Sequence, residues 1–212
     1  MDALWIWLAA TATYLAFRAW YDGWRGPLRP EEIETYLKRI EASDLTNATN
    51  ATDVETLRRF MEEDDGREFV MLNLVRLNPE PAPHPETGEP TPARELLRGY
   101  LGPFLPPLLR RAGHPLLQAR KVGGYVDAWN VEPDPGWSFV GYMRYRSRRD
   151  LAELVATPSF AAGHPFKAAA LPNTFSFPTQ PMFSLYAGPR IWVGLLLALL
   201  AALAHLVALG LA

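Results

Sequence analysis

The sequence contains no cysteine in 212 residues. That absence excludes a disulfide framework, a thiolate metal site and a cysteine nucleophile. An excess of charge of one sign is also lacking, because the net charge is only −2. This balance excludes a chain built around electrostatic binding of nucleic acid. Charge is almost absent from both ends: only Asp2 and Arg18 lie outside residues 21–190, where about a quarter of the residues are charged. We therefore expect a soluble domain between two apolar ends.

Motifs for several common chemistries are missing as well. The four histidines are scattered, with no H-E-x-x-H or H-x-H pair, at His84, His114, His164 and His205. Without such spacing no metal site is predicted. There is also no phosphate-binding loop, no G-x-S-x-G elbow and no G-x-G-x-x-G stretch, so hydrolase and nucleotide-binding classes are not indicated.

Both ends have the composition of membrane helices. The C-terminal run IWVGLLLALLAALAHLVALGLA is long enough, at 1.5 Å per residue, to cross a hydrocarbon core of about 30 Å. The N-terminal run ALWIWLAATATYLAFRAW predicts a second span, in which Arg18 reaches the headgroups while Trp20 and Trp24 occupy the interface. A cleavable signal peptide is the alternative, but the chain begins with Asp2 in place of basic residues.

Basic residues beside the spans predict their orientation. Arg25 and Arg29 follow the first span and Arg190 precedes the second, whereas the outer ends carry no Lys or Arg. By the positive-inside rule, we expect an inner-membrane protein with two spans, a cytoplasmic central domain and both termini on the outer side.

Small residues recur every four positions in the second span, at Gly194, Ala198 and Ala202. This spacing lets helices pack closely, against this protein's other helix, a second copy or another integral membrane subunit. The alternative is that alanine is simply common in apolar helices.

The central residues alternate between strand and helix patterns. Strand formers fill the segments 66–78, 114–130, 136–146 and 173–186, and helix patterns fill about 92–111 and 147–171. Three prolines, Pro103, Pro106 and Pro107, predict that the first of these helices kinks or restarts. The order β-α-β-β-α-β predicts an α+β domain of the ferredoxin-like type. The expected organisation is a membrane helix at 1–21, an amphipathic helical linker at 22–65, the α+β domain at 66–188 and a membrane helix at 189–212.

Three stretches carry a family resemblance: MLNLVRLNP, ARELLRGYLGPFLPPLLRRAG and FVGYMRYRSRRDLAELVATPSF. Together they resemble the dimeric α/β-barrel superfamily, in particular a branch of unknown function with an "MxNLxR" first strand and a "YxSRxxLxxLxxxPxF" strand-to-helix step. The resemblance covers about residues 54–181. It implies that two four-stranded sheets close into a barrel across a homodimer, which would leave no exposed sheet edge.

Relatives in that superfamily use the cleft between sheet and helices for haem, for cofactor-less oxidation of polycyclic phenols or for isomerisation. The corresponding candidates here are Asn73, His164 and Tyr142. Asn73 lies among apolar strand neighbours and either orients a ligand or ties a neighbouring loop, because a buried amide needs partners. His164 either transfers a proton or packs at a helix end. Tyr142 either lines a pocket or belongs to the core.

The run RYRSRRD predicts a solvated basic face paired with Asp150 and Glu153. The alternative is contact with the anionic cytoplasmic leaflet, where each basic residue contributes about 1 kcal/mol.

His205 is the only ionisable side chain in the second span, and such groups are functional candidates. With Ala201 four residues earlier, it resembles the A-x-x-x-H element of light-harvesting polypeptides, which implies ligation of bacteriochlorophyll, or of haem, by the imidazole. The alternative is a neutral imidazole that hydrogen-bonds to a neighbouring helix.

Three functions follow as hypotheses. The first is a non-catalytic accessory or scaffold subunit of an inner-membrane complex, photosynthetic or respiratory, that docks through both helices and the α+β domain. The second is a membrane-tethered enzyme or binding module for a hydrophobic small molecule. The third is pigment or haem carriage by His205. The expected partners are membrane lipids, other integral subunits and a second copy of the chain.

Overall fold

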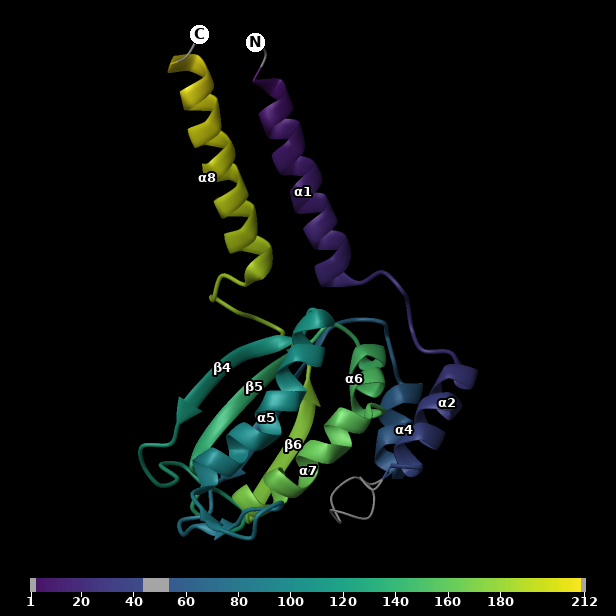
Figure 1. Ribbon diagram of the computed structural model, residues 1–212, viewed down its shortest axis with the longest axis vertical. Helices are drawn as coiled ribbons and strands as arrows, with labels where there is room; N and C mark the ends of the chain where they lie inside the picture. Colours follow the sequence, from purple (N-terminus) through teal and green to yellow (C-terminus); the bar gives the residue numbers. More distant parts are fainter. Residues whose placement is uncertain (1–2, 44–53, 211–212) are drawn as a thin grey trace. The chain divides into compact units, whose positions relative to one another are not determined.

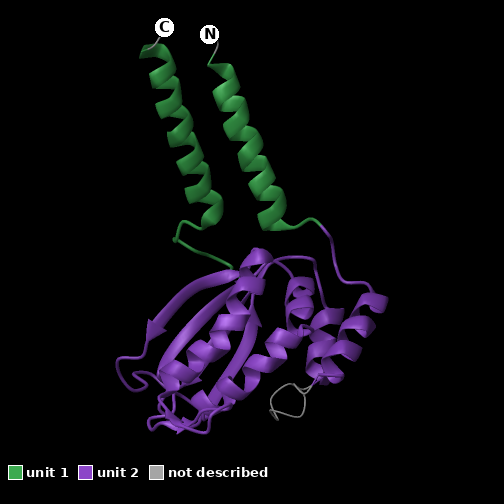
Figure 2. Cartoon of the chain, viewed as in Figure 1, with its two compact units in different colours: residues 1–24, 181–212 green, residues 25–180 purple. Residues whose placement is uncertain are grey.

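The computed structural model describes residues 3–43 and 54–210, so residues 44–53 of the predicted linker lie outside the described residues. The chain forms two compact units, which Figure 2 colours separately. One unit contains both chain ends, residues 1–24 and 181–212, and the other contains residues 25–180.

A four-stranded antiparallel sheet forms the centre of the unit 25–180 (Figure 1). Its strands are β1 (Phe69–Arg76), β4 (His114–Arg120), β5 (Phe139–Tyr145) and β6 (Asn173–Thr179), in the order β4-β5-β1-β6. A separate two-stranded hairpin consists of β2 (Ala82–Pro83) and β3 (Pro90–Thr91). The expected mixed α+β class is confirmed. β4 is shorter than predicted, because the chain leaves the sheet before the flexible pair Gly123 and Gly124.

Three helices, α5 (Ala93–Arg110), α6 (Arg148–Val155) and α7 (Pro158–Ala170), cover one face of the sheet (Figure 1). α5 does not restart at its prolines but runs through Pro103, Pro106 and Pro107 as one helix. Close packing against α7 supports it: a Cβ on Gly99 would lie only 2.5 Å from the Phe166 ring. α6 begins at Ser147, whose Oγ accepts a hydrogen bond from the backbone N–H of Asp150.

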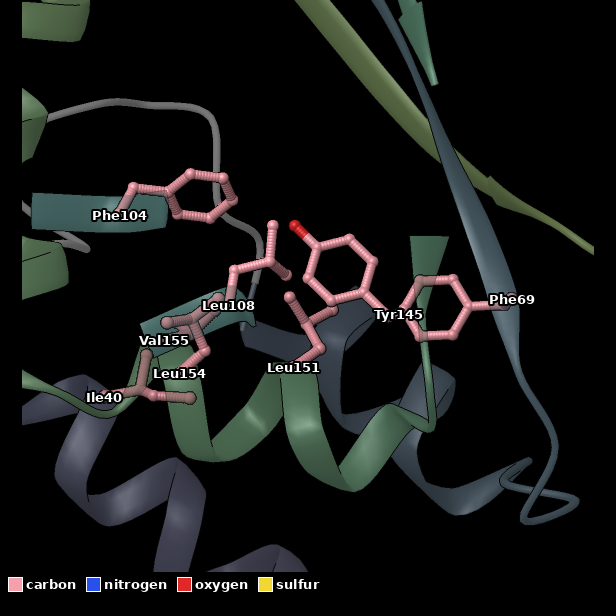
Figure 3. Packing of buried hydrophobic residues seen from close by; sticks show 8 residues of the cluster. All are labelled: Ile40, Phe69, Phe104, Leu108, Tyr145, Leu151, Leu154 and Val155. Carbon is pink, nitrogen blue, oxygen red and sulfur yellow. The ribbon is translucent and has the colours of Figure 1, made fainter. Parts of the chain in front are cut away.

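The main core fills the space between these helices and the sheet, and Figure 3 shows eight of its side chains. The rings of Phe69 on β1 and Tyr145 on β5 stack with centroids 5.1 Å apart. Leu108 from α5 and Leu154 from α6 complete the layer, both almost fully buried. Because side chains alternate along a strand, Phe69 and Tyr145 fix which residues of β1 and β5 face the helices.

The predicted linker contributes two helices to the same unit, α2 (Pro30–Glu41) and α4 (Val54–Glu62). Ile33 and Leu37 of α2 pack with Met61 of α4 and Ala152 of α6 in a second apolar cluster. The amphipathic pattern expected for the linker therefore has its apolar side buried against α6.

The arginine run that begins in β5 is not a solvated face, although Arg146 pairs with Asp150 as expected, at 2.6 Å. Arg144 is only 3% exposed and Arg149 only 4%, because each finds a carboxylate from another part of the fold. Arg144 Nη2 lies 2.6 Å from Glu68, and Arg149 pairs with Glu32 of α2 while donating to the carbonyl oxygen of Pro27 at 2.9 Å. The Arg149 contacts attach the segment around Pro27 and α2 to α6, and the Arg144 pair joins β5 to the residue before β1.

The other unit consists of two helices lying side by side, α1 (Leu4–Asp22) and α8 (Pro189–Gly210) (Figure 1). Of the helices in the described ranges, α8 alone is long and apolar enough to cross a membrane by length and composition. The expectation of two such helices is therefore supported only for the second. α1 falls short because its Thr, Tyr and Trp residues, together with Arg18 and Asp22, lower its apolar character.

Candidate functional site

A row of small and polar residues crosses the middle of the sheet on the side that faces the helices. Gln118 of β4 pairs with Gly141 of β5, Gly141 with Asn73 of β1, and Asn73 with Ser176 of β6. Directly paired residues in an antiparallel sheet point to the same face. Asn73 lies on the face of Phe69 by alternation, so the row faces the helices.

The amide of Asn73 is well satisfied within this row. Its Nδ2 donates to the carbonyl oxygens of Met71 at 3.0 Å and Gly141 at 3.3 Å, and its Oδ1 accepts from Ser176 Oγ at 2.6 Å. Asn73 therefore ties three strands together, which corresponds to the structural alternative for this residue. A Cβ on Gly141 would come no closer than 4.0 Å to any neighbour, so space remains above the row.

His164 belongs to a second group of polar side chains on the same side of the sheet. It lies on α7, only 6% exposed, with its ring centroid 5.9 Å from that of Tyr100 on α5 and 4.8 Å from that of Phe160. Lys167, one turn later on α7, holds its Nζ 5.5 Å from the Tyr100 ring centroid. We call Tyr100, His164 and Lys167 the α5–α7 triad.

Hydrogen bonding assigns the tautomer of His164. Its Nδ1 lies 3.1 Å from the carbonyl oxygen of Phe160, an acceptor, so Nδ1 carries the proton. A neutral imidazole then has an unprotonated Nε2 that can accept a hydrogen bond. Among the described residues, neither this Nε2, nor the Tyr100 hydroxyl, nor the Lys167 ammonium has a hydrogen-bond or ion-pair partner.

Burial shifts the acid–base properties of all three members of the triad. Burial lowers the pKa of His164, an effect opposed by the hydrogen bond to Phe160 and reinforced by nearby Lys167. Burial likewise lowers the pKa of the Lys167 ammonium and raises the pKa of the Tyr100 hydroxyl. Each shift favours the uncharged form, because an apolar environment solvates charge poorly.

Tyr142 lies away from these groups. It follows Gly141 on β5 and pairs with Leu72 of β1 and Leu117 of β4, so it points to the opposite face of the sheet. Asn73, His164 and Tyr142 therefore do not form one constellation.

That opposite face is apolar, and no described helix of residues 25–180 packs on it. We call it the open sheet face, formed by Leu72, Leu74, Leu117, Val140, Tyr142, Phe175 and Phe177. Phe175, Phe177 and Leu117 are 46%, 44% and 45% exposed, and the rings of Phe175 and Phe177 stack 6.1 Å apart. A contiguous apolar surface of this kind is typical of an interaction site.

In the unit formed by α1 and α8, His205 of α8 contacts Trp7 of α1. The indole Nε1 of Trp7 lies 3.1 Å from His205 Nδ1, and the two rings meet edge to face. This contact corresponds to the neutral, helix-bridging alternative for His205.

The predicted small-residue stripe only partly faces α1. A Cβ on Gly194 would lie 3.3 Å from the Tyr14 ring, but Ala198 is exposed and Ala202 half-buried, whereas Ala201 is 4% exposed. Residues spaced by four advance about 40° around a helix with 3.6 residues per turn, so such a stripe rotates away from a nearly parallel neighbour.

Polar contacts close the other end of the helix pair. Asp22 accepts from Arg18 Nε at 2.5 Å and from Arg190 Nε at 2.7 Å, and the Tyr14 hydroxyl donates to the carbonyl oxygen of Arg190 at 2.8 Å. The arginines that the sequence assigns to the membrane interface are therefore also joined to each other through one carboxylate. Trp20 in the last turn of α1 and Trp24 just after this helix are both exposed.

Across residues 3–43 and 54–210, no three His, Asp or Glu side chains come together as metal ligands. His205, the candidate ligand for pigment or haem, uses Nδ1 for the contact with Trp7, and His164, the candidate for proton transfer, uses Nδ1 for the contact with Phe160.

The comparisons with known proteins identify relatives in fold. Neither a family model nor a curated protein matches the sequence. The crystal structure of RPA0582, a protein of unknown function from Rhodopseudomonas palustris, is 24% identical with a TM-score of 0.50, covering 63% of this chain and 96% of that chain. The crystal structure of methylated RPA0582 is 25% identical with a TM-score of 0.50, covering 64% and 96%. Both similarities concern the fold.

Proposed function

We propose that this protein is a non-catalytic docking subunit of an inner-membrane assembly. In this proposal α1 and α8 hold it in the bilayer, and the open sheet face binds a second copy of the chain. The observation that carries the proposal is the open sheet face, with three aromatic and four aliphatic side chains, on which no described helix of the unit 25–180 packs. Trp137 of the loop between β4 and β5 contacts Phe175 at one end of this face, while Leu117, Phe175 and Phe177 stay exposed.

The finer fold assignment belongs to the same proposal. The order β4-β5-β1-β6 of four antiparallel strands supports a ferredoxin-like domain, with α5 between β1 and β4 and with α6 and α7 between β5 and β6. The strand sequence MLNLVR on β1 and the step from β5 into α6 support membership of the dimeric α/β-barrel superfamily. Two such sheets packed face to face would bury both open faces.

A second copy is the occupant that the chemistry of this face favours. The seven side chains that define this face are uncharged and come from all four strands. Arg76 and Arg144, at the ends of the same rows, are each engaged within the fold, with Asn173 and Glu68. An apolar surface is complementary to itself, which is the condition for a two-fold symmetric interface.

Membrane anchoring by both helices is supported by where their large side chains point. α8 exposes Leu195, Leu199 and Leu203, and α1 exposes Trp5, Leu8 and Leu15, all at about half or more of their surface. Only the faces between the helices are covered, so the remaining apolar surface requires lipid or another subunit.

The orientation follows from the basic flanks. Arg25 and Arg29 follow α1 in the sequence, and Arg190 lies in the first turn of α8. The positive-inside rule then favours a cytoplasmic location for the unit 25–180.

The experiment is a comparison of two aspartate variants in mild detergent. Phe177→Asp places a charge in the open sheet face, and Leu109→Asp places one on an exposed position of α5, outside that face. We expect Phe177→Asp to elute at half the protein mass of the wild type in light-scattering chromatography, with Leu109→Asp unchanged. Wild-type mass for Phe177→Asp, or a monomeric wild type, would refute docking through this face.

A further inference from the structure

The connection between β6 and α8 is apolar and exposed. Residues 181–189 read PMFSLYAGP and contain no charged side chain. Four of its large side chains, Met182, Phe183, Leu185 and Tyr186, are between 81% and 99% exposed. We call residues 182–186 the pre-α8 segment. A contiguous group of exposed apolar side chains is typical of a site that contacts a partner or a membrane.

The connection that follows α1 is different. It contains Arg25 and Arg29, and Leu28 between them is buried in the apolar cluster of α2, α4 and α6. The apolar side chain of that connection is therefore covered within the unit 25–180, whereas the described part of the chain covers almost none of the pre-α8 segment.

Aromatic side chains gather at the end of the helix pair to which the pre-α8 segment is joined. Asp22, the last residue of α1, bonds to Arg190 in the first turn of α8, so the C-terminal end of α1 lies beside the N-terminal end of α8 (Figure 1). Trp20 of α1 and Trp192 of α8 are both about half exposed there. Tyr186 precedes α8 by three residues and adds to this group. Trp and Tyr are enriched where membrane helices pass through the headgroups.

The length of α8 sets where the hydrocarbon would begin. Its 22 residues, at 1.5 Å each, extend about 33 Å, close to the thickness of about 30 Å of a hydrocarbon core. The core would then begin within the first turn of α8, and the headgroups would occupy about the next 5–8 Å. An extended chain covers at most about 3.6 Å per residue, so residue 184 can lie as far as about 18 Å from Pro189. The segment is long enough to leave the headgroup layer, and its side chains decide whether it does.

We propose that the pre-α8 segment lies in the headgroup layer of the bilayer, with Met182, Phe183 and Leu185 towards the acyl chains. Two observations favour lipid as the occupant. The segment is joined directly to α8, and it contains no charged side chain that would resist burial at the bilayer surface. This inference rests on the membrane anchoring by α8 in the proposed function, and it is independent of docking through the open sheet face.

Spin labelling tests the position of the segment, because the chain has no cysteine and a single introduced thiol gives no background. Ser184→Cys places the label inside the segment and keeps all four large side chains. Full-length protein is reconstituted in phosphatidylcholine vesicles. Power-saturation EPR then compares collisions of the label with oxygen, which concentrates in lipid, and with a nickel chelate, which stays in water.

Two reference labels calibrate the measurement. Leu199→Cys is on an exposed position in the middle of α8, and Ser159→Cys is on an exposed position of α7. We expect the label at residue 184 to lie within about 8 Å of the hydrocarbon boundary, with fewer nickel collisions than the label at residue 159.

Matched variants identify the side chains responsible. Phe183→Ser together with Leu185→Ser, in the Ser184→Cys protein, should raise the nickel collisions of the label to the level seen at residue 159. Val122→Ser removes an apolar side chain as exposed as Leu185 from the connection between β4 and β5, and it should leave the depth of the label unchanged. All these side chains are exposed, so folding should be as in the wild type.

Three results would overturn the inference while the label at residue 199 still reports lipid, which would leave the anchoring by α8 intact. The first is a label at residue 184 that meets nickel as often as the label at residue 159, since the segment would then lie in water. The second is a label shielded from both oxygen and nickel, since protein would then cover the segment. The third is an unchanged depth in the double serine variant. If the label at residue 199 also collides freely with nickel, both this inference and the proposed anchoring by α8 fail.

Discussion

The indole N–H of Trp7 on α1 donates a hydrogen bond to Nδ1 of His205 on α8 across 3.1 Å. The donor can only donate, so His205 Nδ1 is the acceptor and the proton of the neutral imidazole is on Nε2. Neither ring nitrogen then has a free lone pair for a metal. Ligation of bacteriochlorophyll or haem by His205 requires this contact between the two helices to break.

The first prediction concerns pigment. We expect protein purified from its own membranes to have no visible tetrapyrrole absorption, because Trp7 occupies the acceptor nitrogen of His205. The absorption spectra of the wild type and of His205→Leu check this. A visible band in the wild type that disappears in His205→Leu would show that the imidazole is a ligand instead.

The second prediction concerns the contact between α1 and α8. Gly194→Leu should destabilise the helix pair by about 1–3 kcal/mol, because a Cβ there already meets the Tyr14 ring at 3.3 Å. Ala198→Leu is the matched control on the exposed side of α8, with an expected change within about 0.5 kcal/mol. Unfolding of both variants in detergent is the measurement. If Gly194→Leu and Ala198→Leu lowered the stability equally, the stripe of small residues at four-residue spacing would be the packing surface.

The third prediction concerns Arg149. Its guanidinium is 4% exposed and joins Glu32 of α2 to the carbonyl oxygen of Pro27. Arg149→Met should lower the free energy of unfolding by about 3 kcal/mol, since Glu32 loses a buried partner. Arg58→Met breaks the more exposed pair with Glu34 and should cost less than about 1 kcal/mol.

Urea unfolding of the two arginine variants is the check. If Arg149→Met and Arg58→Met lowered the free energy of unfolding by similar amounts, α2 would be held in place by its apolar contacts and not by the pair of Arg149 with Glu32.

The fourth prediction concerns pH. Burial lowers the pKa of His164 in the folded protein, so the unfolded chain takes up a proton first as the pH falls. The contribution of His164 to stability is therefore complete above the unfolded pKa of about 6.5 and is lost as the pH falls below it. The slope from this single group is at most about 1.4 kcal/mol per pH unit.

We expect His164→Gln to reduce the loss of stability between neutral and mildly acidic pH, as measured by urea unfolding at a series of pH values. An identical pH profile in wild type and His164→Gln would contradict the burial of this imidazole.

The strands were predictable where local signals are strong. β1 falls within the predicted segment 66–78, since branched and aromatic residues are bounded by Gly66 and Pro79. α8 was evident from its continuous apolar run. α1 was harder to assign, since Thr, Tyr and Trp give it an intermediate composition.

The site was less predictable, because it depends on contacts between distant residues. Alternation along β1 and β5 says nothing about which positions pair, so the sequence did not reveal that Asn73 pairs with Gly141 and lies opposite to Tyr142. The partners of Arg144 and Arg149, Glu68 and Glu32, are far away in the sequence. Lys167 carried no local signal, since its environment comes from the packing of α7 against Tyr100 of α5.

The docking role is tested most directly by native mass spectrometry of the wild-type protein, extracted from its own membranes in the mildest usable detergent. The account predicts a particle with at least two copies of the 23.8 kDa chain, alone or together with other integral subunits. A particle that contains a single copy of the chain, with or without other proteins, would contradict it.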